Sequence, residues 1–456
     1  MQMLLLFVAS TLGELPRPAF TDTFPWARTP TMCQTHIPGG IFVRRDMAGT
    51  GRFADEVVAF LANNMALVVA NGLEPGLPSQ CAEAAVGELA DRIHAVNPNS
   101  KVILYQANMI VHSHKASLMP TGVPETLLLC GLDNVAPSML ARDPATGTLV
   151  TTHGGSQYIH NLSDPAMRAQ WLNVVLNKSL GNHVAGVFAD NSFDGATLSS
   201  WMTPDVAAAY MEGQQSLLAS VVAAGKYVIF NGLRLHYNSR GKVTDDIASL
   251  DTELPYGSSG YFEPWLGYSY RPDRTTGKLD ATLATHALLR MINASTTQPT
   301  KGVAFRAGPG PCVGFIGGQA IGCTWPFANH STPPVPNEMN GTPETAEARR
   351  AAAAKLITFP LATFLCAAGP KWHFDYGWGY AINDFVPGTG PNSTIAGQPK
   401  MQSNVPDNWY PELLRAPGTP SGPCVHNAAT STFSREWSGV SVKLSMATET
   451  AVLTWK

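Results

Sequence analysis

The stretch Val184-Ala-Gly-Val-Phe-Ala-Asp-Asn-Ser-Phe-Asp-Gly195 joins a short apolar run to a polar end. The run from Val184 to Ala189 has no polar side chain on either face, which is typical of a buried parallel strand. Asp190 and Asn191 follow at the carboxyl end of this strand, where barrels of parallel strands build their active sites. The same two residue types also favour turns and caps, so the rest of the chain must decide between these interpretations.

Eight strand-like segments alternate with helical patterns along the 456 residues. We predict strands at Ile41–Arg44, Met65–Ala70, Lys101–Gln106, Val184–Ala189, Lys226–Asn231, Ser258–Glu263, Gly302–Arg306 and Lys371–Asp375. Helices are expected near 53–62, 80–96, 164–180, 204–224, 243–250, 278–292 and 342–369. This order predicts an α/β chain with a (β/α)8 TIM barrel. An open doubly wound sheet is the structural alternative, but its dinucleotide fingerprint is absent after the early strands, and no cofactor is expected.

Changes in composition and in residue periodicity divide the chain into three parts. Residues 1–36 form a leader and a wrapping segment, residues 37–375 form the catalytic barrel, and residues 376–456 form a small C-terminal β appendage. In the last part Val440, Val442 and Leu444 alternate with polar residues, as in an antiparallel strand. The start, residues 1–10, has a short apolar core like that of a signal peptide, although no positive residue precedes it; a clipped start is the alternative.

Composition and short motifs indicate which binding partners and which cellular compartment to expect. Charged residues make up 14% of the chain and the net charge is −3, so nucleic acid is not an expected partner. Six Asn-x-Ser/Thr sites favour a secreted glycoprotein, and they start at Asn161, Asn177, Asn293, Asn329, Asn340 and Asn392. The seven cysteines include no C-x-x-C pair, and Cys312 and Cys323 could form a disulfide. No stretch is long and apolar enough to span a membrane, and the sequence does not indicate an oligomeric state.

Polar residues gather at or just after the predicted strand ends, together with aromatic ones. Such a ring suits a sugar, because each hydroxyl needs a donor and an acceptor and the flat sugar face suits an aromatic ring. The expected substrate-binding residues are Asp46, Asn71, Gln106, Asn108, Asn191, Asp194, Asn231, Trp265, Arg306 and Asp375, with Arg44 beside them.

Two carboxylates on different strands suit cleavage of a glycosidic bond. We expect Asp190 to be the nucleophile and Glu263 to be the acid/base. Glu263 lies between Phe262 and Trp265 in sequence, and burial in such apolar company would raise the pKa of its carboxyl. The alternative is a surface residue before Pro264. Asp194 and Asp375 are reserve candidates for catalysis.

Several short motifs resemble those of hypothetical TIM-barrel glycoside hydrolases related to the α-galactosidase and α-amylase groups. Residues 186–191, followed by Asp194 and Gly195, are similar to the D-G-[IV]-F-x-D-N strand of these proteins, with Ala185 in place of the first Asp. Further resemblances are Ser163-Asp-Pro-Ala-Met-Arg168, Gly260-Tyr-Phe-Glu263 and Phe433-Ser-Arg-Glu-Trp-Ser-Gly-Val440. The resemblance implies that Asp190 is the nucleophile and Glu263 the acid/base of a glycosidase.

Two other functions stay open from the sequence. A carbohydrate-binding barrel without catalysis would keep the amides and aromatic rings but not two carboxyl groups at working distance, roughly 5–5.5 Å for retention or 6.5–9.5 Å for inversion. A metal-dependent hydrolase would use His112 and His114, with Asp375 and His236 as further ligands. That ligand set is incomplete, so no metal is expected.

Overall fold

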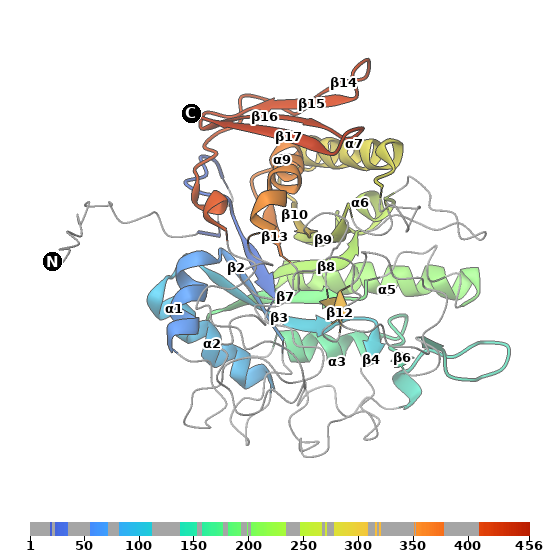
Figure 1. Cartoon of the computed structure of the whole chain (residues 1–456). Helices are drawn as coiled ribbons and strands as arrows, with labels where there is room; N and C mark the ends of the chain where they lie inside the picture. The colour runs from blue at the N-terminus through green and yellow to red at the C-terminus, as the bar shows by residue number, and fades with distance from the viewer. Residues whose placement is uncertain are drawn as a thin grey trace.

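The computed structural model describes residues 19–20, 23–34, 55–71, 82–111, 137–152, 157–176, 181–192, 198, 202–233, 247–266, 270, 278–308, 315–316, 319–320, 351, 353–377 and 410–456. Within them, eight parallel strands form one sheet that curves into a barrel with helices around it (Figure 1). The predicted TIM barrel with a small C-terminal β appendage is confirmed.

The strands of the barrel follow one another in chain order. They are β1 (Met32–Gln34), β2 (Leu67–Asn71), β3 (Lys101–Ala107), β7 (Val184–Asp190), β8 (Tyr227–Leu233), β9 (Ser259–Trp265), β10 (Gly302–Ala307) and β13 (His373–Tyr376). A parallel bridge between Thr31 and Phe374 joins the last strand to the first, and the Phe374 amide donates to the Pro30 carbonyl at 2.9 Å. Seven of the eight predicted strands agree with these to within a few residues.

The first strand differs from the prediction. The segment 41–44 lies outside the described residues, and the strand that pairs with β2 is Met32–Gln34, with Met32 opposite Leu67. It has only three residues and lies in the segment that we assigned to the leader and wrapping region. A strand this short among prolines and threonines leaves no periodic signal. The barrel therefore begins before residue 37.

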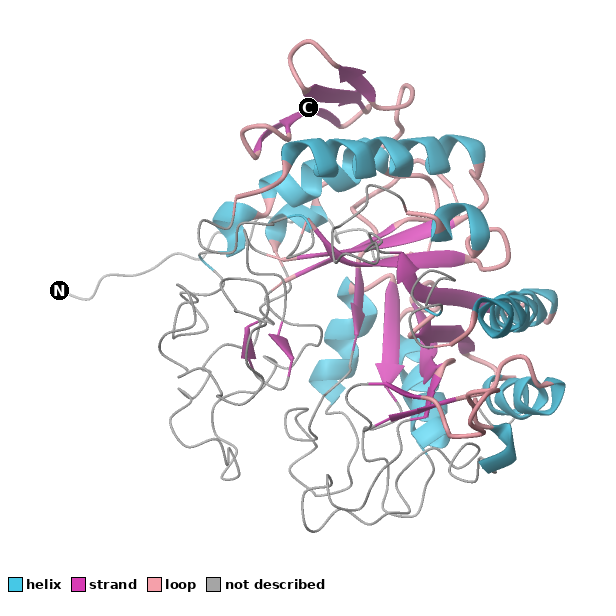
Figure 2. Ribbon diagram, turned by 90° about the vertical axis from the view of Figure 1, so that its right-hand side faces the viewer, coloured by secondary structure: helices cyan, strands magenta, loops and turns pink. Residues whose placement is uncertain are grey.

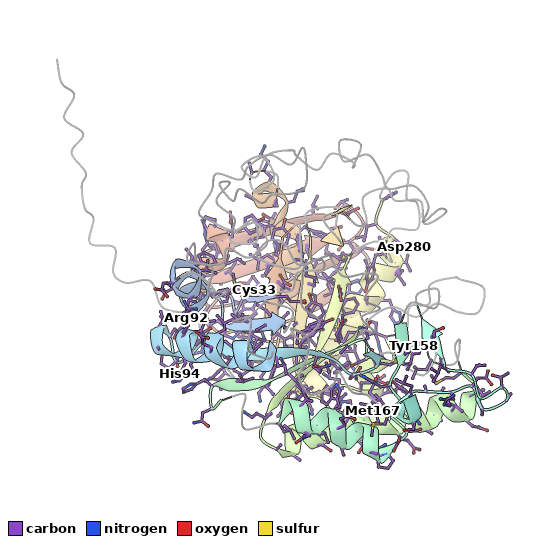
Figure 3. The ribbon with its side chains drawn as sticks, turned by 90° about the horizontal axis from the view of Figure 1, so that it is seen from below. Cys33, Arg92, His94, Tyr158, Met167 and Asp280 are labelled. Carbon is purple, nitrogen blue, oxygen red and sulfur yellow. A yellow bond between two sulfur atoms is a disulfide. The ribbon has the colours of Figure 1, made fainter. Side chains whose placement is uncertain are left out.

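Helices connect the strands at the expected places. They are α1 (Asp55–Asn64), α2 (Ala82–Val96), α3 (Pro165–Val175), α5 (Pro204–Ala223), α6 (Ser249–Thr252), α7 (Ala281–Thr297) and α9 (Thr358–Ala367). The predicted start of α3 is confirmed, because Pro165 opens the helix and the Asp164 carboxylate accepts from the Ala166 amide at 2.8 Å. Seen from below, α2 with Arg92 and His94, and α3 with Met167, lie around the outside of the barrel (Figure 3).

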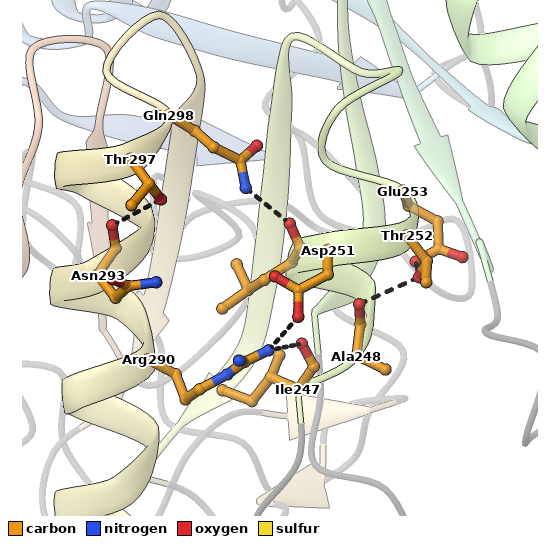
Figure 4. Close-up of polar contacts among 10 residues, drawn as sticks. Ile247, Ala248, Asp251, Thr252, Glu253, Arg290, Asn293, Thr297 and Gln298 are labelled. Atoms are coloured by element: carbon orange, nitrogen blue, oxygen red, sulfur yellow. Dashed lines mark hydrogen bonds and ion pairs between the residues drawn. The ribbon is translucent and has the colours of Figure 1, made fainter.

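The short helix α6 is only one turn long and is held by its neighbour α7. Figure 4 shows the Arg290 guanidinium donating to the Ile247 carbonyl and forming an ion pair of 2.6 Å with Asp251. The Gln298 side chain donates to the Leu250 carbonyl at 3.0 Å. These contacts position a segment whose own helical signal is weak.

The two long insertions both start at the carboxyl end of a barrel strand. After β3, a three-stranded antiparallel sheet forms, and a short 3-10 helix lies within the same insertion; the elements are β4 (Ile110–Val111), η2 (Pro137–Met139), β5 (Thr151–Thr152) and β6 (Gln157–Ile159). After β10, a second antiparallel pair forms, β11 (Phe315–Ile316) with β12 (Gln319–Ala320). Insertions at this end of the strands lie at the mouth of the barrel.

Side chains of the strands alternate between two cores. One core lies inside the barrel and comprises Met32, Leu67, Val69, Ile103, Tyr105, Phe188, Ile229, Tyr261 and Ala304. The other, larger core packs the strands against the helices. Gly186 of β7 lies so close to β8 that an added Cβ would come within 1.7 Å of the Tyr227 carbonyl oxygen, so only glycine fits there.

The C-terminal appendage packs against α9 beside α7, on the outside of the barrel (Figure 1, Figure 2). Its four antiparallel strands are β14 (Val425–Asn427), β15 (Thr432–Glu436), β16 (Val440–Ser445) and β17 (Thr450–Trp455), preceded by the 3-10 helix η8 (Pro411–Leu414). A disulfide joins Cys366 of α9 to Cys424, with the two Cα atoms 5.2 Å apart. The predicted pairing of Cys312 with Cys323 lies outside the described residues.

One arginine explains the motif at residues 433–440. The Arg435 guanidinium donates to the carbonyls of Leu365, Cys366 and Ala368 at 2.7–3.1 Å, which are the groups that the end of α9 leaves without partners. The guanidinium also lies over the ring of Trp437, 4.8 Å from its centre. The motif therefore fastens the appendage to the barrel. None of the described helices is both long and apolar enough to cross a membrane.

Candidate active site

Side chains along each strand alternate between the inside and the outside of the barrel, and this alternation decides which strand-end residues face the barrel mouth. Phe188 and Tyr261 lie in the inner core, so the residues two positions further on, Asp190 and Glu263, face inward one layer higher. By the same rule Asn231 lies above Ile229, and Arg306 lies above Ala304. Arg306 and Asp375 stand opposite each other in the register of β10 and β13.

One amide connects the two predicted catalytic carboxylates. The Asn231 Nδ2 atom donates to Asp190 Oδ1 at 2.7 Å and to Glu263 Oε2 at 2.5 Å. Since both oxygens bond the same nitrogen, they cannot be farther apart than these two distances taken together, about 5.2 Å. Both carboxylates are half-buried. We call Asp190 and Glu263, which Asn231 joins, the bridged pair.

Two further donors hold Asp190. The Tyr105 hydroxyl of β3 and the Asn191 side chain both donate to Oδ2, the latter at 3.0 Å. Asn191 reaches back because its backbone is left-handed, with φ of 58°, a conformation that asparagine tolerates better than most residues. Asp190 thus accepts at both oxygens from neutral donors on three different segments.

A third carboxylate lies at the same barrel mouth. Asp375 forms an ion pair of 3.4 Å with Arg306, both side chains being fully buried, and Tyr261 donates to its other oxygen at 3.2 Å. Burial raises the pKa of the Asp375 carboxyl to about 6, although Arg306 and Tyr261 oppose the rise; the Glu263 carboxylate adds to it. Arg306 also donates to the Ala307 and Gly377 carbonyls. We call Arg306 and Asp375 the buried ion pair.

Three of the expected sugar-binding residues have buried structural contacts. Gln106 donates to the Ala107 carbonyl, and Asn108 donates to Ser192 at 2.9 Å and to Gln214 of α5 at 3.4 Å. Trp265 is 1% exposed, and its Nε1 donates to Thr363 of α9 at 3.0 Å. Asn108 and Trp265 thus contact the surrounding helices, whereas the Gln106 side chain bonds its own strand.

The orientation of Trp265 has a local cause. Phe262 pairs with Phe305, but Trp265 pairs with Ala307, so β9 has one residue more than β10 over this interval. An extra residue of this kind shifts the alternation of the strand. Glu263 therefore faces inward while Trp265 points to the helices, although simple alternation would place the two on one face.

Other predicted residues lie outside what the structure describes. Arg44, Asp46, Asp194, His112, His114 and His236 belong to this group. Asn71 ends β2, but its side chain is not described. Among the described ranges, no group of three or more His, Cys, Asp or Glu side chains could hold a metal ion.

Sequence reasoning missed Tyr105 as a site residue and did not assign Tyr261 to the site. Their rings flank Phe188 inside the barrel, with Tyr105 stacked at 5.7 Å and Tyr261 edge-on at 5.0 Å between ring centres. Each phenol bonds a carboxylate, Asp190 and Asp375 respectively. Tyr261 could have been found from the sequence, because it precedes Glu263 by two residues and therefore shares its face of the strand. Tyr105 could not, because its contact with Asp190 depends on the register between β3 and β7.

Part of the chain resembles a known protein family. Residues 94–306 match the model of hypothetical glycosyl hydrolase family 15. The predicted resemblance is confirmed. The matched stretch contains Tyr105, Asp190, Asn231, Glu263 and Arg306, and ends before Asp375. No curated protein sequence matches the chain significantly.

Solved structures of low identity also align with the chain. A noncanonic maltogenic α-amylase from Thermotoga neapolitana is 9% identical, with 91% of this chain and 86% of that chain covered and a TM-score of 0.45. Amy13B of Eubacterium rectale is 13% identical, with coverages of 94% and 89% and a TM-score of 0.45. The GH36 α-galactosidase AgaB of Geobacillus stearothermophilus is 11% identical, with coverages of 76% and 38% and a TM-score of 0.36.

Proposed function

We propose that this protein is a retaining glycoside hydrolase that cleaves O-glycosidic bonds of an oligo- or polysaccharide. The observation that carries the proposal is the single Asn231 nitrogen bonded to both Asp190 and Glu263. Because the two bonded oxygens lie no more than about 5.2 Å apart, the carboxyl groups are close enough for the roughly 5–5.5 Å separation of retaining enzymes, and this favours retention over inversion, which uses about 6.5–9.5 Å. The match to a glycosyl hydrolase family over residues 94–306 supports the same reaction class.

The reaction divides between the two carboxyl groups. Asp190 attacks the anomeric carbon while Glu263 gives its proton to the leaving oxygen, so the glycosidic bond breaks as a glycosyl ester forms on Asp190. Glu263 then takes a proton from water, and the resulting attack on the anomeric carbon releases the sugar and restores the Asp190 carboxylate. Asn231 keeps both groups on the same side of the barrel throughout.

The test is hydrolysis of a panel of α- and β-linked aryl glycosides and polysaccharides, with the product anomer followed by NMR. Wild type is compared with Asp190→Asn and with Asp205→Asn, an exposed carboxylate at the start of α5. We expect retention of configuration and loss of activity only in Asp190→Asn, by on the order of 10⁴-fold. Inverted product would contradict the retaining mechanism, and equal activity in all three proteins would remove Asp190 as the nucleophile. Sugar binding without hydrolysis would favour the carbohydrate-binding barrel.

We also infer that the chain is secreted and glycosylated. The disulfide between Cys366 and Cys424 suits an oxidising compartment, and Asn293 of the Asn-Ala-Ser site is exposed on α7. Protein from the native source should lose mass on removal of N-linked glycans, and an Asn293→Gln variant should lose less. Unchanged mass after deglycosylation would refute glycosylation.

A further inference from the structure

Tyr105 belongs to the inner core of the barrel, yet its hydroxyl reaches the mouth. The phenol donates to Asp190 Oδ2 across 85 positions of sequence. The ring is 8% exposed and stacks on Phe188, whose backbone precedes Asp190 by two residues on the same strand. Strand β3 and strand β7 are neighbours, with Ala107 opposite Asp190. The ring and the carboxylate are therefore attached to rigid, adjacent strands.

The two oxygens of Asp190 are held differently. Oδ2 accepts from Tyr105 and Asn191, whereas Oδ1 accepts from Asn231, which it shares with Glu263. Two donors on one oxygen fix the rotation of the carboxylate about its Cβ–Cγ bond. The other oxygen, Oδ1, lies on the side of Glu263, because both bond the Asn231 amide.

We propose that Tyr105 is a positioning residue that fixes Oδ2 of Asp190 and thereby presents Oδ1 to the anomeric carbon; this rests on the proposed function. Tyr105 acts through Asp190 and is not itself a nucleophile. Burial and the carboxylates of Asp190 and Glu263 raise the pKa of its phenol well above the ordinary value, so the hydroxyl stays protonated and remains a donor.

The chain offers a matched control. Tyr210 of α5 is also buried, and its hydroxyl has no hydrogen-bond partner among the described residues. Tyr210→Phe removes the same atom from a buried ring of the outer core, between the strands and the helices. A general effect of deleting a buried hydroxyl would appear in both variants, whereas a positioning effect would appear only in Tyr105→Phe.

The experiment compares wild type, Tyr105→Phe, Tyr210→Phe, Asp190→Asn and the Tyr105→Phe/Asp190→Asn double variant. We expect Tyr105→Phe to lower kcat about 10–100-fold, the loss typical of one hydrogen bond to a charged group, with KM changed less than about threefold. In the Asp190→Asn background the same substitution should have no further effect on kcat.

Thermal unfolding of the same proteins gives a readout that does not depend on activity. If the contact exists, the Tm losses of Tyr105→Phe and Asp190→Asn should not add in the double variant. An active wild type with unchanged kcat in Tyr105→Phe would overturn the Tyr105 proposal alone. Additive Tm losses would also overturn it. A wild type that hydrolyses none of the panel, with non-additive Tm losses, would overturn the proposed function and the catalytic role of Tyr105, leaving only a structural contact.

Discussion

The bridged pair and the buried ion pair occupy the same barrel mouth, but their carboxylates differ in burial and in the charge of the groups that hold them. Asp190 and Glu263 are half-buried and are held by neutral donors from Asn231, Tyr105 and Asn191. Asp375 is fully buried and has a charged partner, Arg306. The first arrangement leaves both carboxylates partly accessible, whereas the second encloses Asp375 completely.

The pKa of Asp375 shows the energetic cost of the second arrangement. Even with Arg306 at 3.4 Å, burial dominates and raises the pKa of the carboxyl to about 6. Desolvation of a buried ion pair commonly exceeds the attraction between its charges. We therefore propose that the buried ion pair is structural and that the bridged pair is catalytic, and four predictions test that division, in order of expected effect.

The largest effect should follow Glu263→Gln, which removes a proton donor and leaves the shape unchanged. For substrates with poor leaving groups we expect kcat to fall about 10²–10⁴-fold, while activated aryl glycosides should lose much less in the glycosylation step. Steady-state and burst kinetics measure both values. Glu212→Gln, an exposed residue of α5, is the control. Equal losses for both leaving-group classes would argue against an acid role for Glu263.

Breaking the buried ion pair should affect stability rather than chemistry. Arg306→Met should lower the free energy of unfolding by about 3–5 kcal/mol, since it leaves a buried carboxylate without its cation. Urea denaturation at pH 7 measures this loss. The double variant Arg306→Met/Asp375→Leu should recover most of it. A double variant as unstable as the single one would mean that the pair contributes more than charge compensation.

The pH dependence of stability should report Asp375. Because its folded pKa, about 6, lies above its unfolded value, the folded state binds the proton more tightly. Its contribution to stability is therefore complete below about pH 4 and declines as pH rises to about 6, by about 3 kcal/mol. The difference in unfolding free energy between wild type and Asp375→Asn should fall over this interval. A difference that stays flat between pH 4 and 7 would contradict the raised pKa.

The smallest effect concerns the left-handed turn beside Asp190, the proposed nucleophile. Asn191→Ala should cost about 1–2 kcal/mol of stability, because alanine does not tolerate φ of 58°, whereas Asn191→Gly should keep the backbone at little cost. Both variants lose the hydrogen bond to Asp190 and should lose activity to a similar extent. If only the alanine variant lost activity, the backbone conformation and not the amide would orient Asp190.

Much of the fold could be predicted from local pattern. Seven strands, most of the helices and the C-terminal appendage follow from apolar runs, helical spacing and Pro or Gly at the boundaries. The first strand could not, since three residues give no period. Asp190 and Glu263 were predicted as partners because they follow strands four and six. Asn108 and Trp265 were expected near the substrate, but a contact with α5 and an extra residue in β9 directed them elsewhere.

The sequence alone determined which residues lie at the strand ends, because each strand and helix can be recognised from the pattern of one continuous stretch of residues. Only the tertiary structure decided which of them meet. Asn231 joins carboxylates 41 and 32 positions away, and Tyr105 bonds one 85 positions away. Such contacts depend on the register between neighbouring strands, and a shift of one residue reverses the face of every side chain. The register is set by packing across the barrel, which no local stretch of sequence contains.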